Sequence, residues 1–306
     1  MSKNVVISGA TGFIGSKLAR YLVDKDYNIV VLTRDISRAR AKFERRMIIE
    51  YFDGKTCLNG IRHFENAEAI INLAGENIGT GFWTRRKKAE ILQSRLSAIR
   101  AFDEVIKQTK NKPKCFIQSS ATGYYGSQGN KIIEENSAKG DGFLASVCET
   151  IEDEIKGISE FGIRTAIIRS GIVLGNGGYL KKIQKIFKKI AGVYFGNPNN
   201  WISWIHIEDE IRAIEHIIKN ENLNGIFNLT APSPVIAKTF NKELCRKFKC
   251  RTVFNLPAFL ALLTGKDFAN DILLTSQRVL PTKLESSGFE FLYKEIGEAL
   301  DNLIQD

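Results

Sequence analysis

Short apolar runs alternate with longer stretches of helical periodicity over the first two thirds of the chain. Each run has the continuous β-branched character of a parallel strand that is buried on both faces. The predicted strands are residues 5–7, 29–32, 70–73, 115–118, 166–169 and 226–229. The predicted helices are residues 17–24, 86–109 and 143–161. This alternation predicts an α/β fold with a doubly wound parallel sheet.

The regular alternation weakens after about residue 174, where Gly and Asn become frequent. Trp201 and Trp204 fall in this region, and packing is a better interpretation for both than a stacking platform. The end of the chain shows mainly helical patterns that are interrupted by prolines. We expect two domains: a core of residues 1–232, with 174–206 contributing to a substrate pocket, and a smaller, mainly helical C-terminal domain of residues 233–306.

The first predicted strand runs into a glycine-rich turn, which a predicted helix follows. The first glycine permits a tight turn, the second lets a pyrophosphate approach the backbone, and the third lets helix and strand pack closely. The phosphates then bind to the free N–H groups at the N-terminus of the helix, where the helix dipole is positive. Residues 1 to about 35 therefore predict a Rossmann-type dinucleotide-binding unit, with cofactor contacts from Gly9, Thr11, Gly12, Phe13, Ile14 and Gly15.

The end of the second predicted strand indicates which dinucleotide is bound. An NAD enzyme usually carries a carboxylate at this strand tip, which accepts hydrogen bonds from the adenosine ribose. Here Thr33 occupies the tip and Arg34 follows it. A guanidinium group can hold a 2′-phosphate through forked, charge-assisted hydrogen bonds, which favours NADP(H). Asp35 is the alternative, because its carboxylate can rotate toward the ribose and serve NAD(H).

Composition narrows the class of protein without naming a function. The 306 residues are 43% hydrophobic and 25% charged, as is usual for a soluble globular chain. No apolar run approaches the ~20 residues of a membrane span, and the chain enters its first strand too early for a signal peptide. The five cysteines form no Cys-x-x-Cys motif and there are three histidines, so we expect no metal site. A reduced, cytoplasmic setting is the default expectation.

The formal net charge is +10, from 44 Lys and Arg against 34 Asp and Glu. Such an excess can attract an anionic cofactor and substrate, or a nucleic acid. The basic residues are spread along the chain, and the dense run at residues 181–189 has the pattern of an amphipathic helix with a solvated basic face. We therefore expect a small-molecule substrate rather than a nucleic acid or a membrane as partner, and a homodimer is left open.

Three motifs together go beyond a generic dinucleotide-binding unit. They are the Gly-x-x-Gly-x-x-Gly spacing, Asn72-Leu73-Ala74-Gly75 after one strand, and Ser119-Ser120-Ala121-Thr122-Gly123-Tyr124-Tyr125-Gly126 after another. The combination resembles the extended short-chain dehydrogenase/reductase superfamily of nucleotide-sugar epimerases and dehydratases. One atypical branch of it, epimerase-like proteins with a C-terminal domain of unknown function, is resembled more narrowly by residues 72–78, 94–95, 169–175 and 204–207 and by the tail from 280–283 through 288–289. The match covers essentially the whole chain.

The resemblance implies NADP(H) binding and adds cofactor contacts to those of the glycine turn. The implied contacts are Thr33 and Arg34 at the adenosine end, the backbone of Leu73 and Ala74 along the cofactor, Val173 near the nicotinamide, and Glu90 and Arg95 from the helix after residue 85. The alternative for Glu90 and Arg95 is a surface helix pair. Their spacing of five residues does not suit a helical pair, which favours the cofactor role.

Hydride chemistry in this superfamily normally relies on a Ser and a Tyr-x-x-x-Lys pair. Ser120 is in the expected place for the Ser, with Ser119 as second choice, and capping of the strand end is the alternative role. Counted back from Glu152, the Tyr position is Leu144 and the Lys position is Cys148. Leu cannot transfer a proton and a neutral thiol supplies no positive charge, so the usual proton-transfer pair is missing.

Other side chains can be considered for the missing proton donor. Tyr124 and Tyr125 follow the Ser strand, and a phenol can act there if its pKa is lowered; packing beside the site is the alternative. Cys148 is either a reactive thiolate or a buried helix cysteine. His206 either lines the substrate pocket or hydrogen-bonds the backbone as a structural histidine.

The sequence thus predicts an NADP(H)-binding, epimerase-like oxidoreductase that acts on a small polar substrate such as a nucleotide-linked sugar. In this hypothesis Ser120 positions the substrate carbonyl or hydroxyl group. The missing Tyr and Lys support a hypothesis of a different class, a regulatory protein that senses NADPH and does no chemistry. A third hypothesis, nucleic-acid binding, rests on net charge alone.

Overall fold

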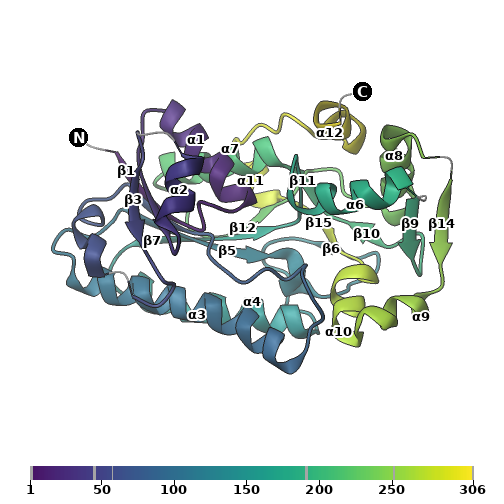
Figure 1. Cartoon of the computed structure of the whole chain (residues 1–306), viewed down its shortest axis with the longest axis horizontal. Coiled ribbons are helices and arrows are strands. Elements are labelled where there is room, and N and C mark those ends of the chain that lie inside the picture. The colour runs from purple at the N-terminus through teal and green to yellow at the C-terminus, as the bar shows by residue number, and fades with distance from the viewer. Residues whose placement is uncertain (1–2, 44–45, 57, 190–191, 251, 305–306) are drawn as a thin grey trace. The chain divides into compact units, whose positions relative to one another are not determined.

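The computed structural model describes residues 3–43, 46–56, 58–189, 192–250 and 252–304. Its main sheet has seven parallel strands in the order β12-β7-β5-β4-β1-β2-β3, which confirms the predicted α/β fold (Figure 1). The strands are β1 (Asn4–Ser8), β2 (Asn28–Thr33), β3 (Ile48–Tyr51), β4 (Ala69–Asn72), β5 (Cys115–Ala121), β7 (Arg164–Ser170) and β12 (Gly225–Leu229).

The central strands are those with continuous apolar runs. All predicted strands are present, and the sequence pattern missed only β3 in this sheet. This strand lies at the sheet edge beside β2, where Ile48 and Tyr51 stay exposed. An edge strand with one solvated side does not need a continuous apolar run, so it gave no signal.

Helices cover both faces of the sheet. The helices α1 (Phe13–Asp24) and α2 (Ile36–Lys42) lie on one side of the strands β1 and β2, and α3 (Arg85–Gln108) lies on the other (Figure 1). The helix α1 begins at Phe13 rather than at residue 17, because helical hydrogen bonding starts directly after the glycine turn. The helix predicted over residues 143–161 is two helices, α4 (Phe143–Glu154) and α5 (Lys156–Ser159).

The chain forms two compact units, each made of separated segments. The first comprises residues 1–120, 150–168 and 214–226, and the second comprises residues 121–149, 169–213 and 227–306. In the first unit, the ring of Phe102 on α3 lies at centroid distances of 5.4 Å from Phe52 and 5.7 Å from Phe116. This buried layer holds α3 against the sheet. The division at residue 232 stays a prediction.

The second unit has its own core around Trp204, which is fully buried as expected of a packing residue. The helices α6 (Gly178–Lys189), α8 (Ala237–Phe248) and α12 (Ile296–Leu303) contribute to this core. Four two-stranded sheets accompany them: β8 (Ile172–Leu174) with β11 (Trp204–His206), β9 (Gly192–Phe195) with β14 (Val253–Leu256), β10 (Trp201–Ile202) with β13 (Val235–Ile236), and β6 (Ile132–Ile133) with β15 (Arg278–Val279). Trp201 is half-buried, and the guanidinium of Arg278 lies over its ring at 4.4 Å.

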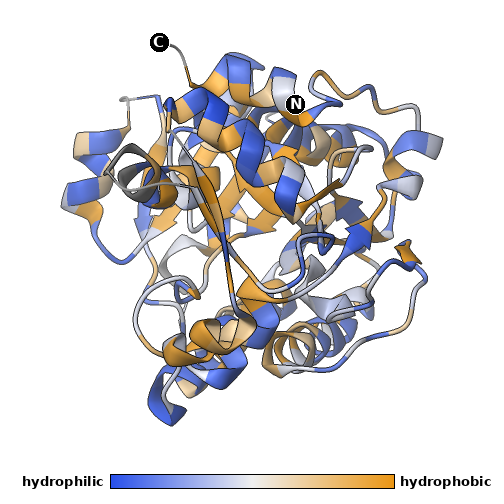
Figure 2. Cartoon of the chain, turned by 90° about the vertical axis from the view of Figure 1, so that its right-hand side faces the viewer, coloured by the Kyte–Doolittle hydropathy of each residue, from blue (hydrophilic) through white to orange (hydrophobic). Residues whose placement is uncertain are grey.

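The remaining helices are short except for one. The long one is α7 (Ile207–Lys219), and the short ones are α9 (Ala258–Ala261), α10 (Lys266–Phe268), α11 (Thr282–Ser286), the 3₁₀ turns η1 (Leu58–His63), η2 (Thr122–Tyr125) and η3 (Leu262–Thr264), and the π-helical turn η4 (Ala269–Leu273). The helices show mixed blue and orange residues while the main strands are mostly orange, as two-sided burial of the sheet requires (Figure 2). Within the described part of the chain, no helix is long and apolar enough to cross a membrane.

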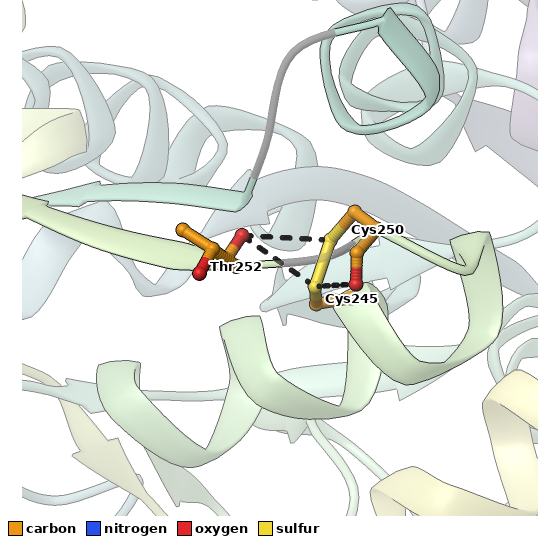
Figure 3. Close-up of a disulfide and its surroundings, with 3 residues drawn as sticks. All are labelled: Cys245, Cys250 and Thr252. Atoms are coloured by element: carbon orange, nitrogen blue, oxygen red, sulfur yellow. Dashed lines mark hydrogen bonds between the residues drawn. A yellow bond between two sulfur atoms is a disulfide. The ribbon is translucent and has the colours of Figure 1, made fainter.

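A disulfide joins Cys245, in the last turn of α8, to Cys250 (Figure 3). Lys249 ends the helix in the left-handed conformation with a φ of 55°, and the chain turns back so that the two Cα atoms are 5.0 Å apart. The expectation of reduced cysteines is therefore wrong for this pair. The two cysteines are five residues apart, a spacing that matches no familiar motif, and they meet because the chain reverses at the end of α8. Cys115 and Cys148 are free and buried, and Cys57 lies outside the described residues.

Candidate cofactor and active site

The glycine turn after β1 can be made only with glycine at two of its positions. Gly9 has a φ of 72°, and a Cβ there would lie 2.6 Å from the carbonyl carbon of Leu73. A Cβ on Gly15 would lie 2.4 Å from the carbonyl oxygen of Gly9. Any side chain at these positions would overlap with backbone. The absence of side chains therefore brings the turn into contact with the segment that follows β4.

The N-terminus of α1 has the properties of an anion site. No side chain caps the helix at Gly12, and its first turn, which begins with Phe13 and Ile14, holds no acidic residue. A Cβ on Gly12 would meet only the Gly9 oxygen, at 3.1 Å, so this face of the turn is open. Free N–H groups and a positive helix end favour a phosphate. The turn thus fits the pyrophosphate of a dinucleotide.

Lys42, at the end of α2, reaches the same turn. Its Nζ donates a hydrogen bond of 2.7 Å to the carbonyl oxygen of Thr11. Burial lowers the pKa of Lys42, and the nearby charges of Arg20 and Arg38 lower it further. Lys42 therefore brings a positive charge to the turn, with Arg20 and Arg38 near its own ammonium group, which suits an anionic cofactor. Lys42 was not among the predicted cofactor residues, although a basic helix directly after the strand tip that bears Arg34 was a usable signal.

At the tip of β2 the aspartate is engaged in a hydrogen bond and the arginine is exposed. The Oδ1 atom of Asp35 accepts a hydrogen bond of 2.9 Å from the backbone N–H of Arg38, which caps α2. The backbone N–H of Asp35 in turn donates to Thr33 Oγ1 at 3.2 Å. Arg34 is exposed at this tip. The Asp35 carboxylate is thus occupied as a helix cap, a role worth about 0.5–2 kcal/mol that a turn toward a ribose would forfeit.

A buried polar ladder crosses the ends of β1, β4 and β5. Ser8 Oγ donates to Asn72 Oδ1 at 2.6 Å, and Asn72 Nδ2 donates to Gln118 Oε1 at 2.8 Å. These residues are direct cross-strand neighbours. Because buried polar groups need partners, the ladder fixes the register of the three strands. It therefore sets the loop that begins at Leu73 and the Ser119–Ser120 pair at one edge of the sheet.

The loop after β4 is fastened to α3. The backbone N–H of Glu76 donates to Ser94 Oγ at 2.9 Å, and Arg95 donates to the Glu76 carbonyl oxygen at 3.2 Å. Lys87 pairs with the Glu76 carboxylate, and this hydrogen bond is the main reason why the pKa of Glu76 is lowered. The positive charges of Arg34 and Arg95 also contribute to the lowering. Arg95 thus lies against the loop that carries Leu73 and Ala74.

Glu90 lies elsewhere on α3, in an exposed ion pair. Its Oε1 atom accepts a hydrogen bond of 2.8 Å from Arg86, one helical turn earlier. This is the surface pairing that the sequence analysis held as the alternative, although with a different partner. The cofactor role of Glu90 stays a prediction, and the pair with Arg86 would have to open for it.

Ser120 is hydrogen-bonded to Glu152, which served above only to count back to the Tyr and Lys positions. Its Oγ donates a hydrogen bond of 2.6 Å to Oε1 of Glu152, and both side chains are buried. Glu152 lies one helical turn after Cys148 on α4. Cys148 is buried, with its Sγ 3.8 Å from the carbonyl oxygen of Ala121. The spacing of four residues from the Lys position was a signal that could have identified Glu152.

The two tyrosines after β5 have different surroundings. Tyr125 is fully buried, its hydroxyl donates to Asn228 Oδ1 at 2.7 Å, and burial raises its pKa to about 12. Tyr124 is half-buried, and the guanidinium of Arg169 lies 3.4 Å from its ring centroid. The condition set for a catalytic phenol, a lowered pKa, is not met at Tyr125. Its hydrogen bond to Asn228 suits the alternative role of packing.

His206 combines burial with a backbone hydrogen bond. Its Nδ1 accepts from the backbone N–H of Glu208 at 3.1 Å, at the start of α7, and its ring stacks on Tyr293 with centroids 3.8 Å apart. An accepting Nδ1 carries no proton in this arrangement. The structural role that the sequence analysis left open is therefore present. Val173 is half-buried on β8, and its register partner on β11 is Ile205.

Comparison with known proteins extends these observations to the whole chain. Residues 5–230 match the NAD dependent epimerase/dehydratase family, and residues 256–303 match a domain of unknown function, DUF1731. Epimerase family protein YfhF of Bacillus subtilis is 34% identical over 99% of this chain and 98% of its own length. The chloroplastic SDR39U1 homolog of Arabidopsis thaliana is 33% identical over 98% of this chain and 86% of its own length.

A solved structure agrees in fold. The crystal structure of human epimerase family protein SDR39U1 with NADPH superimposes on this chain with a TM-score of 0.86. The two sequences are 24% identical, and the match covers 98% of this chain and 99% of the human one. The two family matches together cover most of the sequence, and YfhF aligns with nearly the whole chain. These matches establish the family. The chain belongs to the NAD dependent epimerase/dehydratase family and carries a C-terminal DUF1731 domain.

Proposed function

We propose that this protein binds NADP(H) and acts as an epimerase-like oxidoreductase on a small polar substrate of the nucleotide-sugar type. The observation that carries the cofactor choice is the tip of β2, where Asp35 caps α2 and Arg34 remains exposed. A guanidinium can bind a 2′-phosphate in forked geometry, and a carboxylate there would repel it. The NADPH in the human SDR39U1 structure supports the same choice.

Most of the proposed cofactor contacts lie at one edge of the sheet in the first unit. The glycine turn and the N-terminus of α1 would hold the pyrophosphate, and Thr33 and Arg34 would hold the adenosine end. Leu73 and Ala74 would pass along the cofactor, with Arg95 behind them. Val173 is proposed near the nicotinamide, and Glu90 as a further contact. Bound NADP(H) supplies or accepts a hydride at its nicotinamide ring.

Ser120 is proposed to position the reacting oxygen of the substrate. Tyr124 is favoured over Tyr125 as a nearby phenol, since Tyr125 is fully buried and its hydroxyl donates to Asn228. His206 is proposed to line the substrate pocket. The proposed partner is a small-molecule substrate, and the proposed setting is the cytoplasm. A homodimer is a further proposal, which sedimentation velocity would distinguish from a monomer.

A second function, an NADPH sensor without chemistry, is favoured by the occupants of the usual Tyr and Lys positions. Leu144 and Cys148 stand there on α4, and neither can take the missing role in kind. Two measurements separate the functions. In fluorescence titrations, we expect purified protein to bind NADPH at least about tenfold more tightly than NADH. We also expect it to oxidise NADPH in the presence of at least one carbonyl compound of a panel that includes a 4-keto nucleotide sugar. Tight NADPH binding with no oxidation across the panel would favour the sensor.

A further inference from the structure

One stripe of α4 contacts the end of β5 and the turn after it. Leu144, Cys148 and Glu152 are four residues apart, so they share a face of the helix. A Cβ on Gly123 would lie 3.2 Å from Leu144 Cβ, which shows how closely the first of them packs. Cys148 contacts the Ala121 carbonyl, and Glu152 accepts the hydrogen bond of Ser120. The stripe thus has an alkyl group, a buried thiol and one carboxylate.

The hydrogen bond between Ser120 and Glu152 decides what Ser120 can offer to a substrate. A hydroxyl has one hydrogen, and Ser120 gives it to Glu152 Oε1 at 2.6 Å. Toward any other group, Ser120 is then an acceptor only. It can receive a hydrogen bond from a substrate alcohol, but it cannot donate one to a substrate carbonyl unless the bond to Glu152 is broken or Glu152 carries the proton.

We propose that Ser120 and Glu152 form a proton relay that takes the place of the missing Tyr-x-x-x-Lys pair; this inference rests on the proposed function. When an alcohol is oxidised, its O–H bond breaks and the proton forms a bond to Ser120 Oγ. The Ser120 proton moves at the same time to Glu152 Oε1, and the hydride leaves the carbinol carbon for NADP⁺, so that the carbon–oxygen bond becomes a carbonyl. Reduction of a carbonyl runs the same transfers in reverse. The Glu152 proton then moves to Ser120 Oγ while Ser120 gives its own proton to the substrate oxygen.

The surroundings of the pair suit such a relay. Ser120 and Glu152 are each 9% exposed, so water competes little for the hydrogen bond. A short, shielded hydrogen bond is stronger than one in water and needs no reorganisation at the moment of transfer. In this relay Ser120 is the group that touches the substrate, and Glu152 is a positioning residue that acts through Ser120.

The first test uses binding and needs no turnover. In the variant Glu152→Met, Ser120 keeps its hydroxyl hydrogen for a ligand. With NADP⁺ present, calorimetry with cyclohexanol and cyclohexanone, a matched alcohol and ketone, should show a preference for the alcohol in the unmodified protein. The preference should shift toward the ketone by about two- to tenfold in the variant, the worth of one neutral hydrogen bond. An unchanged preference would overturn the assignment of Ser120 as an acceptor.

The second test measures turnover in the variant Glu152→Gln, whose amide preserves the shape but cannot take the proton. We expect kcat to fall about 10²- to 10³-fold with little change in KM. Ser120→Ala should cost a similar factor, the double variant should cost no more than either single one, and Glu152→Asp should recover part of the rate. Glu149→Gln, on the exposed side of the same helix, is the matched control.

The outcomes separate the relay from the proposed function. An unmodified protein that reduces no carbonyl and oxidises no alcohol of the panel refutes the oxidoreductase, and the relay with it. An active unmodified protein whose Glu152→Gln variant keeps kcat within threefold refutes the relay alone. Additive losses in the double variant refute it as well.

Discussion

Lys42 Nζ donates a hydrogen bond of 2.7 Å to the carbonyl oxygen of Thr11, so that α2 is tied to the glycine turn. Replacing Lys42 by Met removes this bond and one of the cations near the proposed phosphate site. Because a positive charge near the phosphates is lost, we expect NADPH and NADH to bind roughly tenfold more weakly. Fluorescence titration measures both affinities. Lys55→Met, an exposed lysine of the same unit, should change neither.

Gly9 and Gly54 allow a matched test of the glycine turn, because both have a positive φ, 72° and 87°. Alanine at Gly54 meets no atom within 4 Å, whereas alanine at Gly9 overlaps with the Leu73 backbone. Gly54→Ala should therefore cost only the conformational strain, about 1–2 kcal/mol. Gly9→Ala should cost more than 3 kcal/mol or prevent folding. Equal free energies of unfolding in urea would contradict the close approach of the two segments.

The sequence predicted the central strands because parallel strands buried on both faces leave a continuous apolar run. It predicted the glycine turn because only glycine fits beside Leu73. The edge strand β3 and the short paired strands of the second unit depend on neighbours that are distant in the chain, and so local patterns were silent. The bond of Lys42 to Thr11 also joins two elements, and the sequence signal for Lys42 was only the basic character of the helix after Arg34.

The site was harder to predict than the fold. Ser120 was identified by its motif, but its bond to Glu152 needed α4 to be placed against β5. The disulfide of Cys245 and Cys250 depends on how α8 ends, which the spacing alone does not show. His206 had two open roles, and the backbone hydrogen bond to Glu208 became visible only with the start of α7 in place.

The disulfide gives a prediction about thiols and stability. Denatured protein that has not been reduced should titrate two fewer thiols with Ellman's reagent than protein treated first with a reductant. Cys250→Ser should lower the free energy of unfolding by about 2 kcal/mol, as expected for a short closed loop. Cys115→Ser is a poor control, since that thiol is buried and its pKa is raised to about 11. Equal thiol counts before and after reduction would contradict the disulfide.

Glu210 on α7 should make stability depend on pH. It is fully buried, its Oε1 accepts a 2.6 Å hydrogen bond from Ser170, and burial raises its pKa to about 8. An acid whose pKa is raised on folding binds its proton more tightly in the folded state. The contribution of Glu210 to the free energy of unfolding is then fully present below its unfolded pKa of about 4.5, and it is lost as the pH rises toward and through about 8.

The variant Glu210→Gln tests this dependence. It keeps an acceptor for Ser170 and cannot ionise, so the loss of stability between about pH 4.5 and 8 should shrink. At pH 8.5 the variant should be more stable than the unmodified protein by on the order of 3–5 kcal/mol, and at pH 4.5 the two should be nearly equal. Thermal denaturation across this range measures the difference. Glu221→Gln, at an exposed site, should leave the pH profile unchanged.

The preference for NADPH over NADH is the most direct test of the proposed cofactor site at the tip of β2. Arg34→Ala removes the guanidinium there, and Arg40→Ala, an exposed arginine of α2, is the matched control. Fluorescence titration should show NADPH binding at least about 30-fold weaker in Arg34→Ala and NADH binding changed less than threefold, because only NADPH carries the 2′-phosphate. An equal loss for both dinucleotides, or an unmodified protein that binds NADH as tightly as NADPH, would contradict the assignment of Arg34.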